Sequence, residues 1–266
     1  MKRKNVTVLL IILGMIANVL SVTGKAYPEK QSIITGSENI ETRQFYYTDF
    51  SRLRIHSGID TDITRAESHA VSITANDNIF EYIEVVKNGD TLHLGMNKAC
   101  SYSCTTVKAT ISLPELNELS VTGGSEGYLR GFSSSKPVKY EITGGSTLHL
   151  DNITTGDAEF KMSGRSKLSG SITMDDGKFH LSGASSVELK GSSVNLSLKA
   201  SGASNFSFAD FNVGNVLVDI GGGSTATVKA EGRLDVDLNG SSKLFYTGNP
   251  TLGNIDISST SVMSKR

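Results

Sequence analysis

The fold of this chain is decided by a stretch that contains two copies of one pattern, residues 179–206, which read FHLSGASSVELKGSSVNLSLKASGASNF. In each copy apolar and polar residues alternate, a small Gly-Ala-Ser signature follows, and the alternation then resumes. Alternation with a period of two residues is typical of a β-strand with one buried face. The stretch therefore predicts a short strand on each side of every signature.

Related signatures recur through the second half of the chain. They begin at Gly123, Gly144, Gly164, Gly183, Gly202, Gly222, Gly240 and, in a degenerate form, Ser259. A β-propeller blade needs about 40 residues, and a leucine-rich repeat needs an asparagine ladder that this sequence lacks. Strands that return every 19–20 residues without intervening helices predict an all-β chain, a parallel β-helix of about eight coils.

The positions around each signature predict the core and the corners of the coils. Counting the first signature residue as position zero, positions −4 and −2 are apolar in every copy. If this parity continues round the corner, the Ser at +2 also points inward. We expect their hydroxyl groups to hydrogen-bond backbone groups at the corners, which leave the strand ladder. The alternative is a row of nucleophilic serines, but no His or Lys repeats beside them to activate a nucleophile. The clearest examples are Ser166, Ser185, Ser204 and Ser224.

The N-terminus is predicted to be a secretory signal peptide, residues 1–26. A basic start, an apolar run over 6–22, and small residues before the expected cleavage point follow in the usual order. A membrane anchor is the alternative, at the lower limit of spanning length. We expect export to the cell surface, the extracellular space or the periplasm, with no membrane insertion after cleavage.

The remaining chain divides by pattern into three parts. Residues 27–44 are expected to form a linker, residues 45–115 an irregular β region with a hairpin, and residues 116–266 the repeats.

The chain holds 26 basic and 27 acidic residues, and four of the basic ones lie before residue 27. This balance argues against nucleic acid as a partner, because nucleic-acid binders usually carry a basic patch.

Two cysteines, Cys100 and Cys104, flank three residues between alternating segments at 92–96 and 107–113. A three-residue hairpin loop would place them face to face, and an oxidising compartment would then favour a disulfide. In an extended strand they would lie about 13 Å apart, too far to bond. Their spacing does not match the C-x-x-C redox or metal motif.

The predicted loop is also the first candidate binding site. It combines the cation of Lys98 with the aromatic ring of Tyr102. Loops on rigid scaffolds carry binding sites more often than regular elements do, and a disulfide would hold this one rigid. The competing interpretation is that the bridge only staples a hairpin.

Position −3 supplies two further candidates on the outward face. Lys161, His180 and Lys199 occupy it in consecutive coils and could bind an acidic sugar as a basic strip. Asp219, Asp237 and Asp256 occupy it later in the chain. Stacked carboxylates repel one another unless a cation lies between them, so a Ca²⁺ site is one expectation and a solvated surface is the other. No other cofactor is expected.

Several segments resemble the head GIN domain family of auto-transporter adhesins from Bacteroides-like bacteria. The matching pieces are TGGS at 143–146, SGRS at 163–166, SGAS at 182–185 and 201–204, FSRLRI at 50–55, GIDTDI at 58–63 and ISLPEL at 111–116. The likeness covers Phe45 to Met263, although most copies lack the Asp of the family's S-G-S-G-D motif. The resemblance implies a right-handed parallel β-helix and supplies no catalytic residues.

These features predict a non-enzymatic surface or periplasmic binding protein, adhesin-like, that contacts a glycan or a host or cell-surface protein. One alternative is a carbohydrate-active β-helix of the polysaccharide lyase type. That chemistry needs a base and a cation or Arg near it, and the five histidines show no metal-ligand spacing. The other alternative is a purely structural envelope protein.

Overall fold

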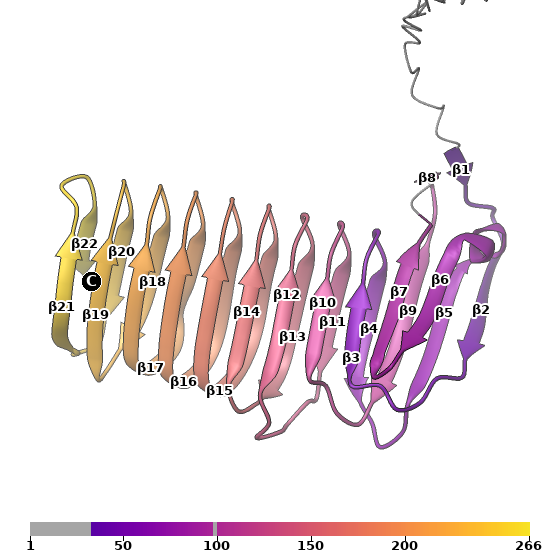
Figure 1. Cartoon of the computed structure of the whole chain (residues 1–266), viewed down its shortest axis with the longest axis horizontal. Helices are drawn as coiled ribbons and strands as arrows, with labels where there is room; N and C mark the ends of the chain where they lie inside the picture. The colour runs from indigo at the N-terminus through magenta and orange to yellow at the C-terminus, as the bar shows by residue number, and fades with distance from the viewer. Residues whose placement is uncertain (1–32, 98–99) are drawn as a thin grey trace, which may run out of the picture. The chain divides into compact units, whose positions relative to one another are not determined.

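The computed structural model describes residues 33–97 and 100–266, which lie in one compact unit. The predicted signal peptide, residues 1–26, lies outside these residues. The described part is nearly all β, with one short 3-10 helix, η1 (Asp77–Tyr82). The predicted β-helix is confirmed, since stacked parallel strands form a β-solenoid of about seven turns, close to the eight expected (Figure 1).

Two faces of strands run along the solenoid. The first face contains, in spatial order, β6 (Ile83–Asn88), β7 (Thr91–Met96), β3 (Arg52–Ile55), β10 (Glu118–Val121), β12 (Val138–Ile142), β14 (Ala158–Met162), the C-terminal halves of β15 (Lys167–Leu181), β16 (Ser186–Ala200) and β17 (Asn205–Ile220), then β19 (Arg233–Leu238) and β21 (Thr251–Ile257). Apart from β6 against β7, neighbours on this face are parallel.

The second face carries the strand that follows each corner. Its order is β2 (Ile40–Phe45), β5 (Ala70–Asn76), β9 (Val107–Leu113), β4 (Asp60–Arg65), β11 (Glu126–Arg130), β13 (Thr147–Thr154), the N-terminal halves of β15, β16 and β17, then β18 (Thr225–Ala230), β20 (Lys243–Thr247) and β22 (Val262–Lys265). Each coil therefore contributes one strand to each face.

The region expected to be irregular, 45–115, is part of the same stack. Strands β3 and β4 pair in parallel with β10 and β11, in the register of the repeats. On their other side they pair in parallel with β7 and β9. The β3/β4 coil therefore lies between two coils that follow it in sequence. Its corner reads Ser57-Gly58 instead of Gly-x-Ser, which is why the repeat pattern does not reveal it.

Antiparallel strands form the N-terminal end of the stack. Strand β5 lies antiparallel to β9, β2 lies antiparallel to β5, and β6 lies antiparallel to β7. The outermost strand, β2, falls partly within the predicted linker, and an ion pair between Arg43 and Glu41 lies on it. Charged side chains on an edge strand discourage further pairing, and solenoids commonly need such polar caps.

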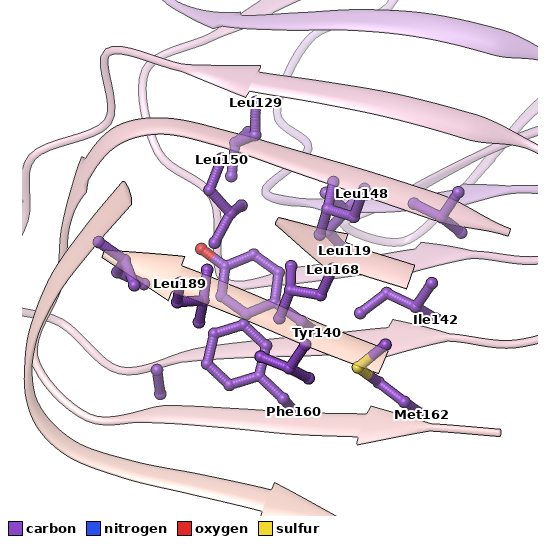
Figure 2. Packing of buried hydrophobic residues seen from close by; sticks show 14 of the residues in the cluster. Leu119, Leu129, Tyr140, Ile142, Leu148, Leu150, Phe160, Met162, Leu168 and Leu189 are labelled. Carbon is purple, nitrogen blue, oxygen red and sulfur yellow. The ribbon is translucent and has the colours of Figure 1, made fainter. Parts of the chain in front are cut away.

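The core lies between the two faces. Residues at the same repeat position in successive coils stack on one another in columns. Tyr140, Phe160 and Phe179 stack with ring centroids 4.7 and 4.3 Å apart. These separations match the spacing between neighbouring strands, so the register of the coils also sets the ring stack. Figure 2 shows Tyr140 and Phe160 surrounded by leucines from both faces.

The corner serines are buried, as the parity of the repeat predicts. Ser166, Ser185, Ser204 and Ser224 are each at most 1% exposed. The hydroxyls of Ser166, Ser185 and Ser204 donate to the carbonyl oxygen three residues earlier, at 2.8, 3.0 and 3.3 Å. These hydroxyl groups therefore stabilise the corners by donating hydrogen bonds to backbone carbonyls that point away from the sheet.

Removal of one corner hydroxyl has a small expected effect. We expect Ser185→Ala to lower the free energy of unfolding by about 1 kcal/mol, because the carbonyl of Ser182 loses its buried donor. Urea unfolding followed by circular dichroism measures this change. The neighbouring Ser186→Ala, on a partly exposed side chain, is the control and should be close to neutral. Equal stability of both variants would contradict the assigned role of Ser185.

Candidate functional site

The two candidate files at position −3 form a single ladder in the structure. The parallel register runs Lys161, His180, Lys199, Asp219, Asp237 and Asp256, with one residue per coil. At the junction, Lys199 Nζ lies 3.4 Å from Asp219 Oδ2. Lys161 Nζ lies 3.0 Å from Glu159 Oε1. The basic strip is therefore partly neutralised by neighbouring carboxylates.

The aspartates of this ladder do not fit a Ca²⁺ site. Calcium takes six to eight oxygen ligands, whereas this ladder supplies one carboxylate per coil, and the second carboxylate of β19, Asp235, is paired with Arg233. Asp219 is paired with Lys199, and Asp237 accepts a hydrogen bond from Asn239 at 2.7 Å. Within residues 33–97 and 100–266, no three His, Cys, Asp or Glu side chains gather closely enough to hold a metal ion.

The hairpin predicted around the two cysteines is wrong. Strands β7 and β9 pair with β3 and β4 on different faces, and the segment between the cysteines is the extended strand β8 (Ser101–Ser103). It pairs in parallel with β1 (Ile33–Thr35). Cys100 and Cys104 are free thiols, because an extended segment holds the two residues about 13 Å apart. The predicted disulfide is not formed.

This arrangement predicts the chemistry of the two thiols. We expect both Cys100 and Cys104 to be alkylated by iodoacetamide in folded protein without reductant, since Cys104 is exposed and Cys100 is half-buried. Intact-mass spectrometry counts the added groups. A mass showing two hydrogens fewer and no alkylation would restore the disulfide and contradict the extended strand.

The aromatic residue of this candidate loop is partly committed to the fold. Tyr102 donates a hydrogen bond from its hydroxyl to the carbonyl of Asn97 at 2.8 Å. Its ring lies edge-on to Tyr82, with centroids 5.9 Å apart. Burial is the main cause that raises the pKa of Tyr102. Lys98, the other member of the candidate, lies outside the described residues.

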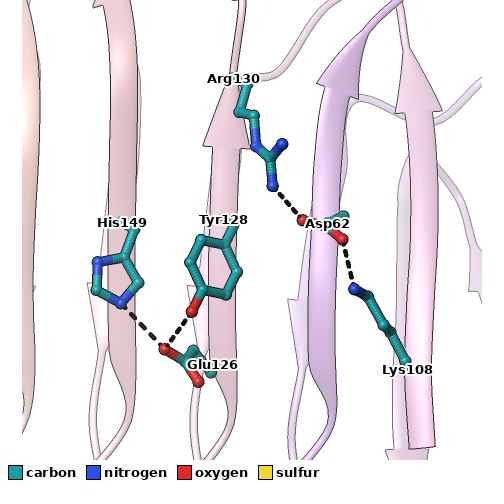
Figure 3. A network of polar contacts seen from close by, with 6 residues as sticks. All are labelled: Asp62, Lys108, Glu126, Tyr128, Arg130 and His149. Carbon is teal, nitrogen blue, oxygen red and sulfur yellow. Dashed lines mark hydrogen bonds and ion pairs between the residues drawn. The ribbon is translucent and has the colours of Figure 1, made fainter.

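A cluster of polar and aromatic side chains that sequence reasoning missed lies on the second face. We call it the β11 patch, and it consists of Asp62, Lys108, Glu126, Tyr128, Arg130 and His149 (Figure 3). These residues come from the adjacent strands β9, β4, β11 and β13. Tyr128 and His149 both lie five residues after the start of their signatures, so counting position +5 along the repeat would have paired them.

One half of the β11 patch is a carboxylate held between two cations. Asp62 lies 3.0 Å from Lys108 Nζ and 2.6 Å from Arg130 Nη2. The side chain of Asp62 is 22% exposed, whereas those of Lys108 and Arg130 are about half exposed. The cations therefore lie at the surface and remain reachable from solvent.

The other half of the β11 patch is centred on Glu126. Its Oε1 accepts a hydrogen bond from the Tyr128 hydroxyl at 2.7 Å and lies 3.0 Å from His149 Nε2. The rings of Tyr128 and His149 are nearly parallel, at 16°, with centroids 4.7 Å apart. His149 Nδ1 lies 2.8 Å from Ser169 Oγ. Both rings are thus fixed by partners on either side.

The carboxylates of this patch influence nearby groups. Burial, followed by repulsion from Glu126, raises the pKa of Asp60, and Lys108 opposes the rise. The hydrogen bond to Glu126 is the first cause that raises the pKa of Tyr128. Tyr128 therefore stays neutral at physiological pH and presents a phenol, not a phenolate. The patch offers fixed donors, acceptors and aromatic surface, all suited to recognition.

The fold defines the class of this protein as a β-solenoid, and its second face carries a rigid aromatic and charged patch. Residues 49–250 match the family model described as "Putative auto-transporter adhesin, head GIN domain". The chain belongs to this family, as the sequence resemblance indicates. Comparison with curated proteins gives no match.

Solved structures share the fold over most of the chain. A putative lipid binding protein from Parabacteroides distasonis has a TM-score of 0.81 at 20% identity, covering 88% of this chain and 100% of its own. A putative adhesin from Parabacteroides merdae has a TM-score of 0.81 at 14% identity, covering 88% and 99%. A putative adhesin from Bacteroides fragilis has a TM-score of 0.64 at 19% identity, covering 88% and 100%. These similarities establish the fold alone.

Proposed function

We propose that this protein is a non-enzymatic, exported binding protein of the adhesin type that contacts glycans through the β11 patch. The observation that carries the proposal is the grouping of Tyr128 and His149 with Glu126, Asp62 and Arg130 on neighbouring strands of the second face (Figure 3). Membership of an adhesin family supports an exported or surface location. Among the described residues, no helix is long and apolar enough to cross a membrane.

The chemistry of the patch suits a polyhydroxylated ligand. Carboxylate oxygens accept hydrogen bonds from sugar hydroxyls, and guanidinium and ammonium groups donate to them. Tyr128 supplies rigid contact area at a low cost in conformational entropy. Because the network holds these side chains in place before binding, less ordering is needed when a ligand arrives. The same face could also contact a protein, which the experiment below separates.

The protonation state of Tyr128 supports binding over lyase chemistry. A lyase needs a base that removes a proton, and a tyrosine serves as one only where its pKa falls toward the working pH. The contact with Glu126 moves the pKa of Tyr128 in the opposite direction. Asp62 lies against Arg130, so this guanidinium already has a carboxylate partner within the protein.

The test is a binding screen of the purified protein on a glycan array, with immobilised host-surface proteins and phospholipid vesicles as parallel arms. We expect a glycan signal that Tyr128→Ala weakens about tenfold or more, as loss of a central aromatic contact usually does. Tyr46→Ala removes the same group from an exposed site and should bind like wild type. Lys161→Ala and Tyr102→Ala test the position −3 ladder and the β8 loop.

The outcomes separate the candidate functions. Binding lost in Lys161→Ala or Tyr102→Ala but kept in Tyr128→Ala would move the site away from the β11 patch. A vesicle signal without a glycan signal would favour the lipid-binding description given to the Parabacteroides distasonis relative. Release of unsaturated sugar products would support the lyase, and no binding in any arm would favour a structural envelope role.

A further inference from the structure

The last coil of the described stack is formed by β21 and β22. Among the described strands, β21 pairs only with β19, and β22 pairs only with β20. Both strands therefore carry an unpaired outer edge, and they form the last coil at the yellow end of the solenoid in Figure 1. Unpaired edges are templates for further strand pairing unless they are covered.

This open edge is also apolar. Leu252, Ile255 and Ile257 of β21 lie in register with the buried residues Leu234, Val236 and Leu238 of β19. Nevertheless, the three β21 side chains are 49%, 41% and 37% exposed. The core columns thus continue into the last coil and end at a surface that water reaches. Such a surface is more favourable when another coil packs against it.

We propose that a second copy of this chain docks on this edge, end to end, with β21 of each copy against β22 of the other. The open end presents two strand edges with an apolar core between them. A single extended peptide would cover one edge only, whereas the same end of a second copy covers both edges and the core. Both copies use the same two strands, so the contact is isologous and the assembly closes at a twofold dimer.

The register of this contact follows from the corner at residues 259–261. Strand β21 runs toward the corner and β22 runs away from it, so a twofold axis parallel to the strands makes the new pair antiparallel. Ile257 and Met263 each lie two residues from the corner. Ile257 therefore faces Met263 of the second copy and extends the core across the contact.

Charge favours this pairing over β21 against itself. Asp256 is the only charged residue of β21, whereas β22 ends at Lys265 and Arg266 follows it. In the proposed register Asp256 lies diagonally across from Arg266 of the second copy, whose guanidinium stacks on Phe245 of its own chain and turns toward Asp256 on docking. Pairing of two β21 strands would offer Asp256 no basic partner, because β21 contains no Lys or Arg.

Analytical ultracentrifugation of the protein over a range of concentrations tests the proposal. We expect a reversible monomer–dimer equilibrium without larger species. Ile257→Lys should weaken the dimer at least about tenfold, because it places a charge in the new core. Val194→Lys introduces the same charge at an exposed apolar site in the middle of the stack, and it should dimerise like wild type.

A charge exchange tests the register. Asp256→Lys and Arg266→Glu should each weaken the dimer about threefold, and the double variant should recover it. A protein that is monomeric at every concentration, or that forms open-ended polymers, would overturn the proposal. Insensitivity to Ile257→Lys would do the same. Failure of the double variant to recover the dimer would overturn the pairing of β21 with β22. Melting temperatures of all variants show whether each one remains folded.

Discussion

Replacement of Gly183 by valine is expected to lower the free energy of unfolding by about 3 kcal/mol or more. Gly183 lies at a corner with φ +74°, in the left-handed region that costs other residues about 1–2 kcal/mol. A Cβ at this position would also lie 2.7 Å from the carbonyl oxygen of Gly164, in the corner of the preceding coil. That oxygen is backbone and cannot rotate away, because it accepts a hydrogen bond from the Ala184 amide at 2.8 Å.

A variant at a second corner distinguishes the cost of the left-handed backbone from the cost of the contact with the Gly164 carbonyl oxygen. Gly145 has φ +80°, but no atom lies within 4 Å of a Cβ built there. Gly145→Ala should therefore show only the backbone cost of about 1–2 kcal/mol, whereas Gly183→Ala should show this cost together with the contact to Gly164. Thermal and urea unfolding of the three variants measure the differences. Equal losses for Gly145→Ala and Gly183→Ala would refute close packing of successive corners.

Truncation of Phe179 to alanine is expected to cost about 3–5 kcal/mol, the usual range for a buried phenylalanine. Phe179 is fully buried and contacts three other rings. Its centroid lies 4.3 Å from that of Phe160 in the preceding coil and 5.3 Å from that of Phe208 in the following one. The cavity would interrupt the ring column in the middle of the stack, where flanking coils cannot easily close it.

The matched control is Tyr46→Ala, because that ring is 94% exposed. It should change the melting temperature little, while Phe179→Ala lowers it markedly. Differential scanning calorimetry also shows whether the solenoid still unfolds in one transition, since repeat proteins with a weakened interior can separate into blocks. A melting temperature for Phe179→Ala within a degree or so of wild type would contradict the continuous column.

The repeat half of the fold could be predicted because one residue pattern carries both strands and corner. Phe179, Leu181 and Ser185 are buried as their positions predict. The N-terminal half could not be predicted in the same way. Its coils are out of sequence order, its first corner lacks the Gly-x-Ser signature, and strands β2, β5 and β9 pair over separations of 26 to 42 residues. Local patterns predict strands, but they do not report which distant strand becomes the neighbour.

The candidate sites were harder to predict for a related reason. The ladder from Lys161 to Asp256 was predicted as two separate features, a basic strip and a set of stacked aspartates, because its residues were grouped by the sign of their charge. The strand register joins them into one ladder. The β11 patch joins Asp62 to Arg130, which are 68 residues apart in sequence. They lie together because the β3/β4 coil stacks beside the β10/β11 coil. The spacing of the repeats does not predict this neighbour, because β3 and β4 lack the repeat signature.

The position of the β3/β4 coil inside the stack has a consequence for the order in which the chain folds. Its two strands are joined by a short corner, so the coil closes a small loop at little entropic cost. Once formed, it presents two free surfaces. The coil β10/β11 and the repeats grow on one surface, while β7, β9 and the cap grow on the other. A terminal coil offers one surface for growth, whereas this one offers two, so the solenoid can extend from it in both directions.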